Sequence, residues 1–426
     1  MTLEASVEAT LSSLRDDQWW AAQRFTIFRV PAYVRDRSRA SYEPRMVYLH
    51  DLLSRHAGGD GTAAAVTAST LVAEVRPLEA QARACYSERP AGMDSDDFVR
   101  MLLLDGCFIL EFFFKWYTEQ PADALCDVGW GLTLVAADLL LMENQIPFFV
   151  IERLYEAVAG VQGTRQSLLN LLAVMYIVDE EPIKWPSGDW DVHHLLHLYY
   201  ECFVPNRSTP PRARRSARSG RRAATTTRAP RAIPCATEMR HAGVKFVARR
   251  SRPAPADAGE ATTTTTYDVA FDDRGGVMEI PTILIDDARR PLLANLIAFE
   301  QSQGGEVAGL LSSYVALMSQ LIVTARDVEL LRRRGVVENL LDNDEEAARF
   351  FNRLGDIDPV DYDTQAFAGL YEDVTRYCGT WRNRHMAGLR RNYFASPWSA
   401  ISIVVAAFVV MLTSTQTYFT VFPSNK

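Results

Sequence analysis

The sequence predicts a mainly α protein, with a large helical body, a small β-hairpin element and a C-terminal transmembrane helix. Over most of the chain, apolar residues recur at steps of three and four, which is the period of an amphipathic helix. A turn-rich segment around residues 272–276 lies between two short extended runs, and the C-terminal end contains a long uncharged stretch. These three observations predict the fold class.

We divide the 426-residue chain into five segments. They are an N-terminal helical lead (1–25), the N-terminal helical half of the body (26–203), a low-complexity basic and Thr-rich linker or insertion (204–266), a C-terminal half with a hairpin followed by helices (267–394), and a transmembrane anchor (397–422). A hydrophobic content of 48% is typical of a globular body. The six cysteines lack a paired metal spacing, which indicates reduced core thiols.

Two segments of the N-terminal half are apolar almost all round, Phe98 to Tyr117 and Gly131 to Tyr155. Helices that are hydrophobic on every face are buried, so these segments are predicted to form the core. Pro147 lies inside the second segment and cannot donate a backbone hydrogen bond. We therefore expect a kink or break over residues 143–147, with nearby polar side chains covering the freed backbone groups.

The range 204–266 is rich in Pro, Arg, Ser, Thr and Ala and has too little apolar surface to fold alone. The alternating pattern around Val269 and Phe271, the turn residues 272–276 and the extended run 277–285 then predict a hairpin. A helix is expected from Tyr314 to Leu331 and ends at Gly335. The next helix is expected to be capped by Asp342 or Asp344 and to close at Gly355.

The uncharged stretch runs from Trp398 to Phe422 and fits a bilayer, which needs about 20 apolar helical residues. Arginines lie upstream of it, so the positive-inside rule predicts a single-pass membrane protein with a cytosolic N-terminal body. The alternative is a buried core helix, because the polar residues Thr413 to Thr417 dilute the second half of the stretch.

Nine arginines occur between Arg207 and Arg231 without one acidic residue. Clustered guanidinium groups can neutralise phosphates, so an anionic lipid surface is one expected contact and a solvated linker is the other interpretation. Nucleic acid is a weaker expectation, because no aromatic residues are interleaved for base stacking.

His193, His197 and Glu201 follow one another at four-residue steps and would share one face of a helix. Such a face can bind zinc, but the sequence has neither an HExxH pattern nor a second ligand cluster. An ordinary helix in which these side chains pack or face solvent is the competing interpretation.

Four acidic residues lie in very apolar segments predicted to be helical, namely Asp105, Glu111, Asp138 and Glu143. Buried carboxylates with separated pKa values can perform acid–base catalysis. Buried acids also pair with basic side chains to hold helices together, and Arg100 and Arg153 are candidate partners. The chain contains no Walker loop, no dinucleotide-binding GxGxxG motif after a strand and no GxSxG elbow.

Several strings, in order along the chain, resemble the plant family called domain of unknown function 247. The matching strings include Ile27-Phe-Arg-Val-Pro31, Ser41-Tyr-Glu-Pro44, Leu104-Asp-Gly-Cys-Phe-Ile-Leu-Glu111, Asp138-Leu-Leu-Leu-Met-Glu-Asn-Gln-Ile-Pro-Phe-Phe149, His193 to Leu198, Ala242-Gly-Val-Lys-Phe246, Asn295-Leu-Ile-Ala-Phe-Glu-Gln301 and Asn392-Tyr-Phe-Ala-Ser-Pro-Trp398. The resemblance covers roughly residues 27 to 422.

One departure from the family pattern follows Pro44. A Gly-Pro-Tyr-His-like string and a Met-Glu-x-x-Lys string usually come next, whereas here residues 45–47 lead straight into Tyr48. The family has no established catalytic residues, so the resemblance transfers none and implies no cofactor. It implies a plant membrane-associated protein, and some grass members are linked to pollen–stigma self-incompatibility.

These observations predict a tail-anchored recognition or signalling protein that binds a protein partner and is not an enzyme. The alternative is a membrane-anchored hydrolase or transferase of unfamiliar type that uses the buried carboxylates and the His193 face. The two hypotheses differ in whether the acids converge on one pocket or are engaged separately in helix packing.

Overall fold

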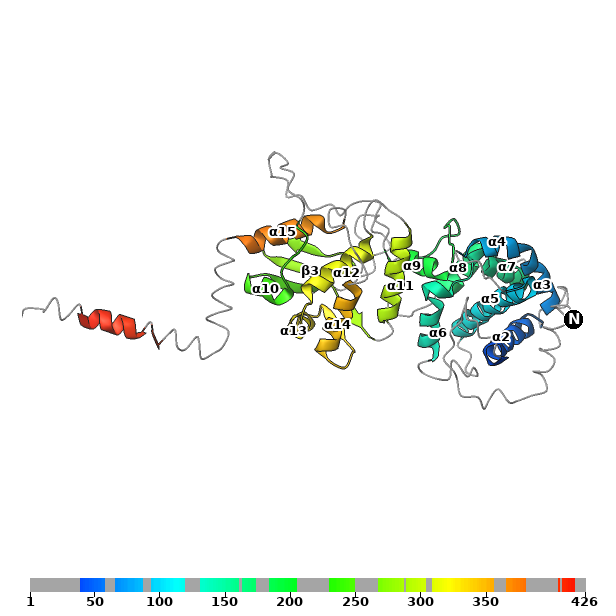
Figure 1. The fold of residues 1–426 in the computed structure, drawn as a ribbon, viewed down its shortest axis with the longest axis horizontal. Coiled ribbons are helices and arrows are strands. Elements are labelled where there is room, and N and C mark those ends of the chain that lie inside the picture. The colour runs from blue at the N-terminus through cyan, green and yellow to red at the C-terminus, as the bar shows by residue number, and fades with distance from the viewer. Residues whose placement is uncertain are drawn as a thin grey trace, which may run out of the picture. The chain divides into compact units, whose positions relative to one another are not determined.

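The computed structural model divides the chain into two compact units (Figure 1). Unit 1 comprises Met1–Asn206 and Asp287–Gly304, and unit 2 comprises Arg207–Asp286 and Gly305–Lys426. The structure describes residues 39–57, 66–86, 93–118, 131–160, 163–173, 184–204, 230–249, 267–286, 289–303, 309–355, 365–380, 405–406 and 408–417. The predicted N-terminal lead and most of the arginine run lie outside the described residues.

The described part of unit 1 contains helices and loops and no strand. Its α-helices are α2 (Arg39–Ala57), α3 (Ala68–Val75), α4 (Glu79–Ala84), α5 (Ser95–Tyr117), α6 (Gly131–Leu139), α7 (Phe148–Ala159), α8 (Arg165–Ala173), α9 (Leu195–Phe203) and α11 (Arg289–Ser302), with the 3-10 helices η2 (Arg76–Leu78) and η3 (Met142–Asn144). Helix α11 follows the first four strands of unit 2 in sequence but packs against α9 and η3 of unit 1.

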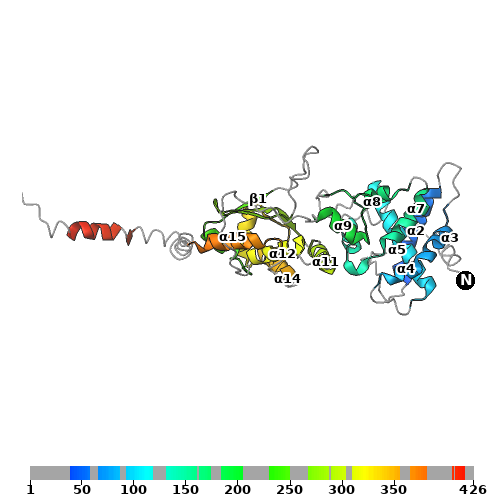
Figure 2. The ribbon, with the colours of Figure 1, turned by 90° about the horizontal axis from the view of Figure 1, so that it is seen from above.

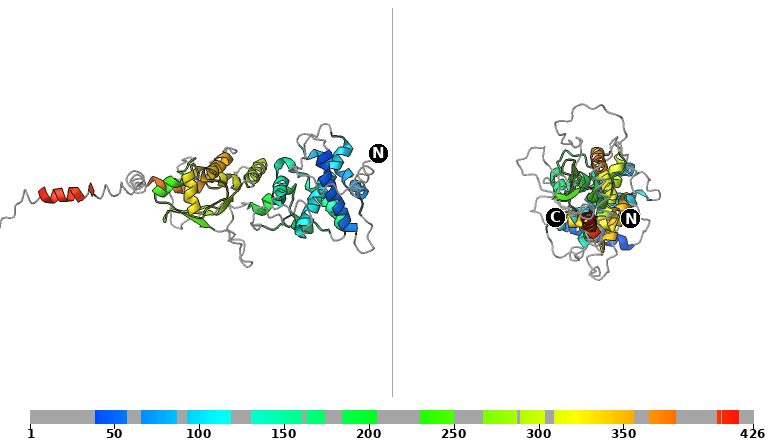
Figure 3. Two further views of the ribbon diagram at one scale, coloured as in Figure 1. Left: turned by 90° about the horizontal axis from the view of Figure 1, so that it is seen from below. Right: turned by 90° about the vertical axis from the view of Figure 1, so that its left-hand side faces the viewer.

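Helix α5 is the core of unit 1, as its apolar sequence predicts. Asp94 caps its first turn by accepting a hydrogen bond from the Asp97 N–H at 2.8 Å. Almost every side chain from Phe98 to Phe113 is buried, and α2, α3, α7 and α8 pack around the helix. A Cβ at Gly106 would overlap the Leu154 side chain, so a residue without a Cβ lets α7 approach closely. In the left view of Figure 3, the blue helix α2 lies on the near face of unit 1.

Unit 2 combines helices with two small sheets. Its elements are α10 (Ala236–His241), β1 (Lys245–Arg249), β2 (Ala270–Asp272), β3 (Val277–Pro281), β4 (Ile283–Ile285), α12 (Leu310–Leu321), α13 (Ala325–Arg333), β5 (Val337–Asn339), α14 (Asp344–Gly355) and α15 (Ala368–Gly379). Figure 2 shows α12, α14 and α15 on one side of the labelled strand β1. Helices α12, α13 and α14 pack together, and α15 contacts β2.

The predicted hairpin is confirmed, because β2 and β3 pair antiparallel with Asp272 opposite Val277. Gly276 closes the turn at φ +62°, a conformation that glycine adopts without strain. The structure adds β1 in parallel on the other edge of β3, and a separate parallel pair of β4 with β5. Strand β1 and helix α10 both come from the range predicted as a linker or insertion.

The single helix expected from Tyr314 to Leu331 is instead two helices, α12 and α13. The Asp327 carboxylate accepts hydrogen bonds from the Thr324 N–H at 2.9 Å and from the Thr237 N–H of α10 at 2.8 Å. Such a cap begins a new helix at a position where apolar periodicity alone would continue the old one. Gly335, at φ +72°, follows α13 as predicted, and α14 ends at Gly355 as predicted. The first turn of α14 is capped by Asn343, whose side-chain oxygen accepts a hydrogen bond from the Glu346 N–H at 2.8 Å.

The predicted C-terminal transmembrane helix is wrong. Within the part of the chain that the structure describes, no helix is long and apolar enough to cross a membrane. Near the C-terminus the described helical residues lie between 405 and 417, which is shorter than the roughly 20 residues that a span needs. Thr413 and Thr417 lie in the last part of this helical segment, and their hydroxyls donate to backbone carbonyls one turn earlier at 2.8 Å. The predicted single-pass localisation and the predicted membrane contact through this helix are corrected with it.

Candidate functional site

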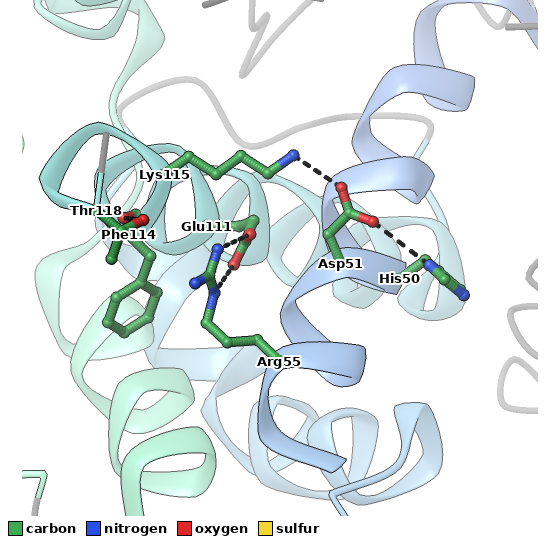
Figure 4. Close-up of polar contacts among 7 residues, drawn as sticks. All are labelled: His50, Asp51, Arg55, Glu111, Phe114, Lys115 and Thr118. Carbon is green, nitrogen blue, oxygen red and sulfur yellow. Dashed lines mark hydrogen bonds and ion pairs between the residues drawn. The ribbon is translucent and has the colours of Figure 1, made fainter. Parts of the chain in front are cut away.

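The two acidic residues predicted in the core helix face α2, where basic side chains meet them. Asp105 lies 2.6 Å from Arg45, and Glu111 lies 2.7 Å from Arg55. A third pair runs in the opposite sense, since Lys115 of α5 donates to Asp51 of α2 at 2.7 Å. Figure 4 shows the second and third pairs, which come from facing positions of the two helices. Each charged group therefore has its own partner across the α2–α5 interface.

Asp105 is the most completely enclosed acid of this interface. Its carboxylate is fully buried, and burial raises its pKa to about 6 although the neighbouring Arg45 guanidinium opposes the shift. The two groups are close enough for an ion pair, but neither carboxylate oxygen has a well-aligned hydrogen bond. We interpret the contact as a charge–charge interaction in a fully buried site.

Glu111 is held more regularly. The Arg55 guanidinium donates to both of its oxygens, from Nη2 at 2.7 Å and from Nε at 3.1 Å, which is the bidentate geometry of strong carboxylate binding. Burial raises the Glu111 pKa, while Arg55 and Lys115 act in the opposite direction. The Arg55 pKa is raised in turn by its hydrogen bond to Glu111. The guanidinium also lies over the Phe114 ring at 5.8 Å (Figure 4).

Asp138 and Glu143, the other two candidate acids, do not belong to this interface. Asp138 is half-buried near the end of α6, and Glu143 is exposed in the 3-10 turn η3. Glu143 is thus neither buried nor in an apolar helix, because the chain leaves the helix before Pro147. The structure brings Asp105 and Glu111 to α2 with separate partners, and it places the other two acids elsewhere.

The predicted break before Pro147 is confirmed, and Gln145 explains how its backbone groups are satisfied. Helix α6 ends at Leu139, and α7 begins after Pro147. The Gln145 amide donates to the carbonyls of Leu139 at 2.8 Å and Leu141 at 2.7 Å, and its oxygen accepts from the Leu196 N–H at 3.0 Å. One neutral side chain therefore joins the end of α6 to the first turn of α9.

Two more hydrogen bonds join distant segments at the same junction. The Phe148 N–H donates to the His193 carbonyl at 2.8 Å, and the Met142 N–H donates to the Asn295 side-chain oxygen at 2.7 Å. Strings that carry the family resemblance, around residues 142–148, 193–198 and 295–301, thus meet in unit 1. Their polar side chains satisfy backbone groups there, which assigns them a structural use.

The predicted histidine face is only partly formed. Helix α9 begins at Leu195, so His193 precedes it and only His197 and Glu201 share a helical face, with Nε2 and Oε1 3.8 Å apart. His193 Nε2 instead lies 3.4 Å from an Asp191 oxygen. Among the described residues, no group of three or more His, Cys, Asp or Glu side chains could hold a metal ion.

His194, which sequence reasoning missed, has a defined structural role. Its Nδ1 accepts a hydrogen bond from the His197 N–H at 3.2 Å and caps α9, and its ring packs edge-on against Phe299 at 5.2 Å. Burial lowers the His194 pKa to about 4, and the neighbouring histidines act in the same direction. The neutral ring that the cap needs is therefore the form that folding favours. The sequence signal was its position just before an apolar helical run.

Sequence, fold and polar contacts define a mainly helical protein of two units, in which Asp105 and Glu111 lie at a helix–helix interface and His193, His197 and Glu143 lie near helix ends. The chain belongs to the plant family called domain of unknown function 247, whose description is "Plant protein of unknown function" and whose family model matches residues 27–412. The resemblance seen in the sequence is thereby confirmed.

Two relatives from Arabidopsis thaliana are similar over most of the chain. The UPF0481 protein At3g47200 is 29% identical over 368 residues, which is 82% of this chain and 73% of the relative. A second UPF0481 protein, At3g02645, is 24% identical over 447 residues, which is 83% of this chain and 79% of the relative. No solved structure matches the chain.

Proposed function

We propose that this protein is a recognition or signalling protein that acts through protein–protein contacts and has no catalytic centre. The observation that carries the proposal is the separate engagement of Asp105 and Glu111 by Arg45 and Arg55 across the α2–α5 interface. A general acid or base must come within hydrogen-bond reach of its substrate. Both carboxylates have no exposed surface, and a basic side chain occupies the approach to each.

The remaining candidates support the same proposal. His197 and Glu201 lack a third ligand among the described residues, and Glu143 is an exposed side chain on a turn. Recognition instead requires a stable body that presents variable loops, and the hydrogen-bonded junctions of unit 1 supply such a body. Self-incompatibility, with which the resemblance connects some grass members, is itself a recognition process and is consistent with this role.

The proposal is tested by identifying a protein that binds the full chain in plant tissue and then reconstituting the complex from purified components. We expect one-to-one or higher-order binding without chemical change in the partner, and binding that persists within about twofold in Glu111→Gln under conditions where circular dichroism shows this less stable variant to be folded. This variant keeps the shape of the side chain but removes its charge. Failure of every recovered partner to bind the purified chain would overturn the proposal. So would modification of a partner by the wild type and not by Glu111→Gln.

A further inference from the structure

The loop 184–190 of unit 1, Lys184-Trp-Pro-Ser-Gly-Asp-Trp190, exposes an aromatic side chain. Trp185 is 55% exposed, and Trp190 in the same loop is half-buried. Tryptophan is highly buried on average because its ring carries a large apolar area. Water therefore contacts an indole surface at Trp185 that folding has not covered.

The loop backbone is held in place by the first turn of α8. The Gln166 side chain binds it twice, because its amide donates to the Pro186 carbonyl at 2.9 Å and its oxygen accepts from the Gly188 N–H at 2.7 Å. The Arg165 guanidinium donates to the Trp190 carbonyl at 2.7 Å. These contacts fix both sides of the loop.

Further backbone bonds fix its start and its turn. The Lys184 N–H donates to the Cys202 carbonyl at the end of α9 at 3.2 Å, and the Trp190 N–H donates to the Ser187 carbonyl at 3.0 Å. A contact loop that is ordered before binding loses less conformational entropy when a partner arrives. Trp185 is thus presented on a preorganised backbone, as aromatic anchors of interfaces are.

The charges of the loop indicate the chemistry of a partner. The Lys184 ammonium lies 5.6 Å from the Trp190 ring centre, whereas among the described residues no cation lies over the Trp185 ring. Asp189 is exposed, and the side chain of Asp191 is 93% exposed. A hydrogen bond with Ser187 lowers the Asp189 pKa, so that carboxylate is ionised at neutral pH. The loop and its next residue thus carry two acids and one lysine, and the lysine is already directed at Trp190.

We infer that loop 184–190 is a docking surface for a protein segment that offers arginine or lysine side chains. Trp185 would receive a cation on its free face, since indole is the best aromatic partner for a guanidinium or ammonium group. Asp189 and Asp191 would supply the opposite charge, which steers and orients a basic segment. This inference rests on the proposed recognition function and specifies one of its surfaces.

The test uses the full chain and a labelled ten-residue peptide in which four arginines alternate with glycine and serine, measured by fluorescence anisotropy. A peptide with glutamate in place of arginine is the chemical control. We expect the arginine peptide to bind and the glutamate peptide not to bind, with affinity falling as salt rises. Trp185→Ala and the double variant Asp189→Asn/Asp191→Asn should each weaken arginine-peptide binding about tenfold or more.

Tyr117→Ala provides the matched control, because Tyr117 is an exposed aromatic residue (67%) at the end of α5, away from this loop in sequence. It should bind the arginine peptide like the wild type, and Trp185→Phe should retain part of the affinity. Equal binding by all variants, or preference for the glutamate peptide, would overturn the inference.

A partner protein separates this inference from the proposed function. If a reconstituted partner binds Trp185→Ala as well as the wild type, the docking surface is wrong and the recognition function stands. If no partner binds the wild type, the recognition function is wrong whatever the peptide does. Loss of partner binding in Trp185→Ala with retention in Tyr117→Ala would support both.

Discussion

The α2–α5 interface and the loop 184–190 use charged and aromatic side chains in opposite ways. In the interface, Asp105 and Glu111 are buried and each is paired with one basic residue of α2. In the loop, Trp185 and the acids near it are exposed, while neutral hydrogen bonds from Gln166 hold the backbone. The comparison teaches that a buried charge in this chain indicates packing, and that exposed groups on a fixed loop are better candidates for contact.

The largest effect is expected from breaking one interface pair. Arg55→Met would leave the fully buried Glu111 without its bidentate partner, and stranding a buried charge costs about 3 kcal/mol or more of unfolding free energy. Urea unfolding followed by circular dichroism measures the loss. Arg76→Met is the control, because the Arg76–Asp96 pair is exposed and should contribute at most about 1 kcal/mol. Equal losses in the two variants would show that burial does not decide the value of a pair here.

A pH-dependent effect of similar size is expected at His194. Its folded-state pKa of about 4 lies below the ordinary value of 6.5, so the unfolded chain binds the proton more readily. Its contribution is therefore fully present above about pH 6.5 and is lost as pH falls toward 4, by roughly 3 kcal/mol. His194→Asn keeps an acceptor for the cap but cannot titrate.

As pH falls from about 6.5 to 4, the wild type should lose unfolding free energy relative to His194→Asn. Denaturant titrations at several pH values provide the measurement. A difference that stays constant from pH 7 to pH 4 would mean that the ring is accessible to protons in the folded protein.

Removal of the Gln145 side chain at the Pro147 junction should lower the unfolding free energy somewhat less, because that side chain is neutral. Gln145→Ala removes three hydrogen bonds to backbone groups, and a loss of about 2–3 kcal/mol follows at roughly 1 kcal/mol each. Glu143→Gln alters an exposed side chain of the neighbouring turn and should change stability by less than about 0.5 kcal/mol. Amide hydrogen exchange should also rise at Leu196 in Gln145→Ala, and unchanged exchange there would contradict this role of the side chain.

The smallest effect on stability is expected in the loop. Trp185→Ala removes a side chain that is 55% exposed and has no hydrogen-bonding role of its own among the described residues, so the unfolding free energy should fall by only about 1 kcal/mol. Thermal unfolding by calorimetry is sufficient to check this. A loss of 2 kcal/mol or more would mean that Trp185 is part of the packing of unit 1, and the contrast between loop and interface would disappear.

Much of the helical architecture was predictable from local pattern. The burial of α5 follows from its apolar residues on every face, and the break before Pro147 follows from the missing N–H of proline. The hairpin of β2 and β3 follows from alternation on both sides of a turn. These features depend on short stretches of sequence, which carry their own physical signal.

What the sequence could not predict depends on contacts between distant residues. Strand β1 lies within a Pro- and Arg-rich range and is defined by its pairing with β3 rather than by its own composition. The acids Asp105 and Glu111 were recognisable as buried, but their partners on α2 lie about sixty residues away in sequence and no spacing rule connects them. The C-terminal stretch was misjudged because hydropathy was counted over the whole range 398–422, whereas the residues of that range that the structure describes contain no helix long and apolar enough to span a membrane.

A double-mutant cycle at Arg45 and Asp105 tests the central claim most directly. The unfolding free energies of Arg45→Met, Asp105→Leu and the double variant are compared with that of the wild type. If the pair serves packing, each single change should cost about 3 kcal/mol or more, and the double variant should recover most of that loss because no buried charge remains. If the two losses simply add, the groups do not act on each other, and the assignment of the buried acids to helix packing would be contradicted.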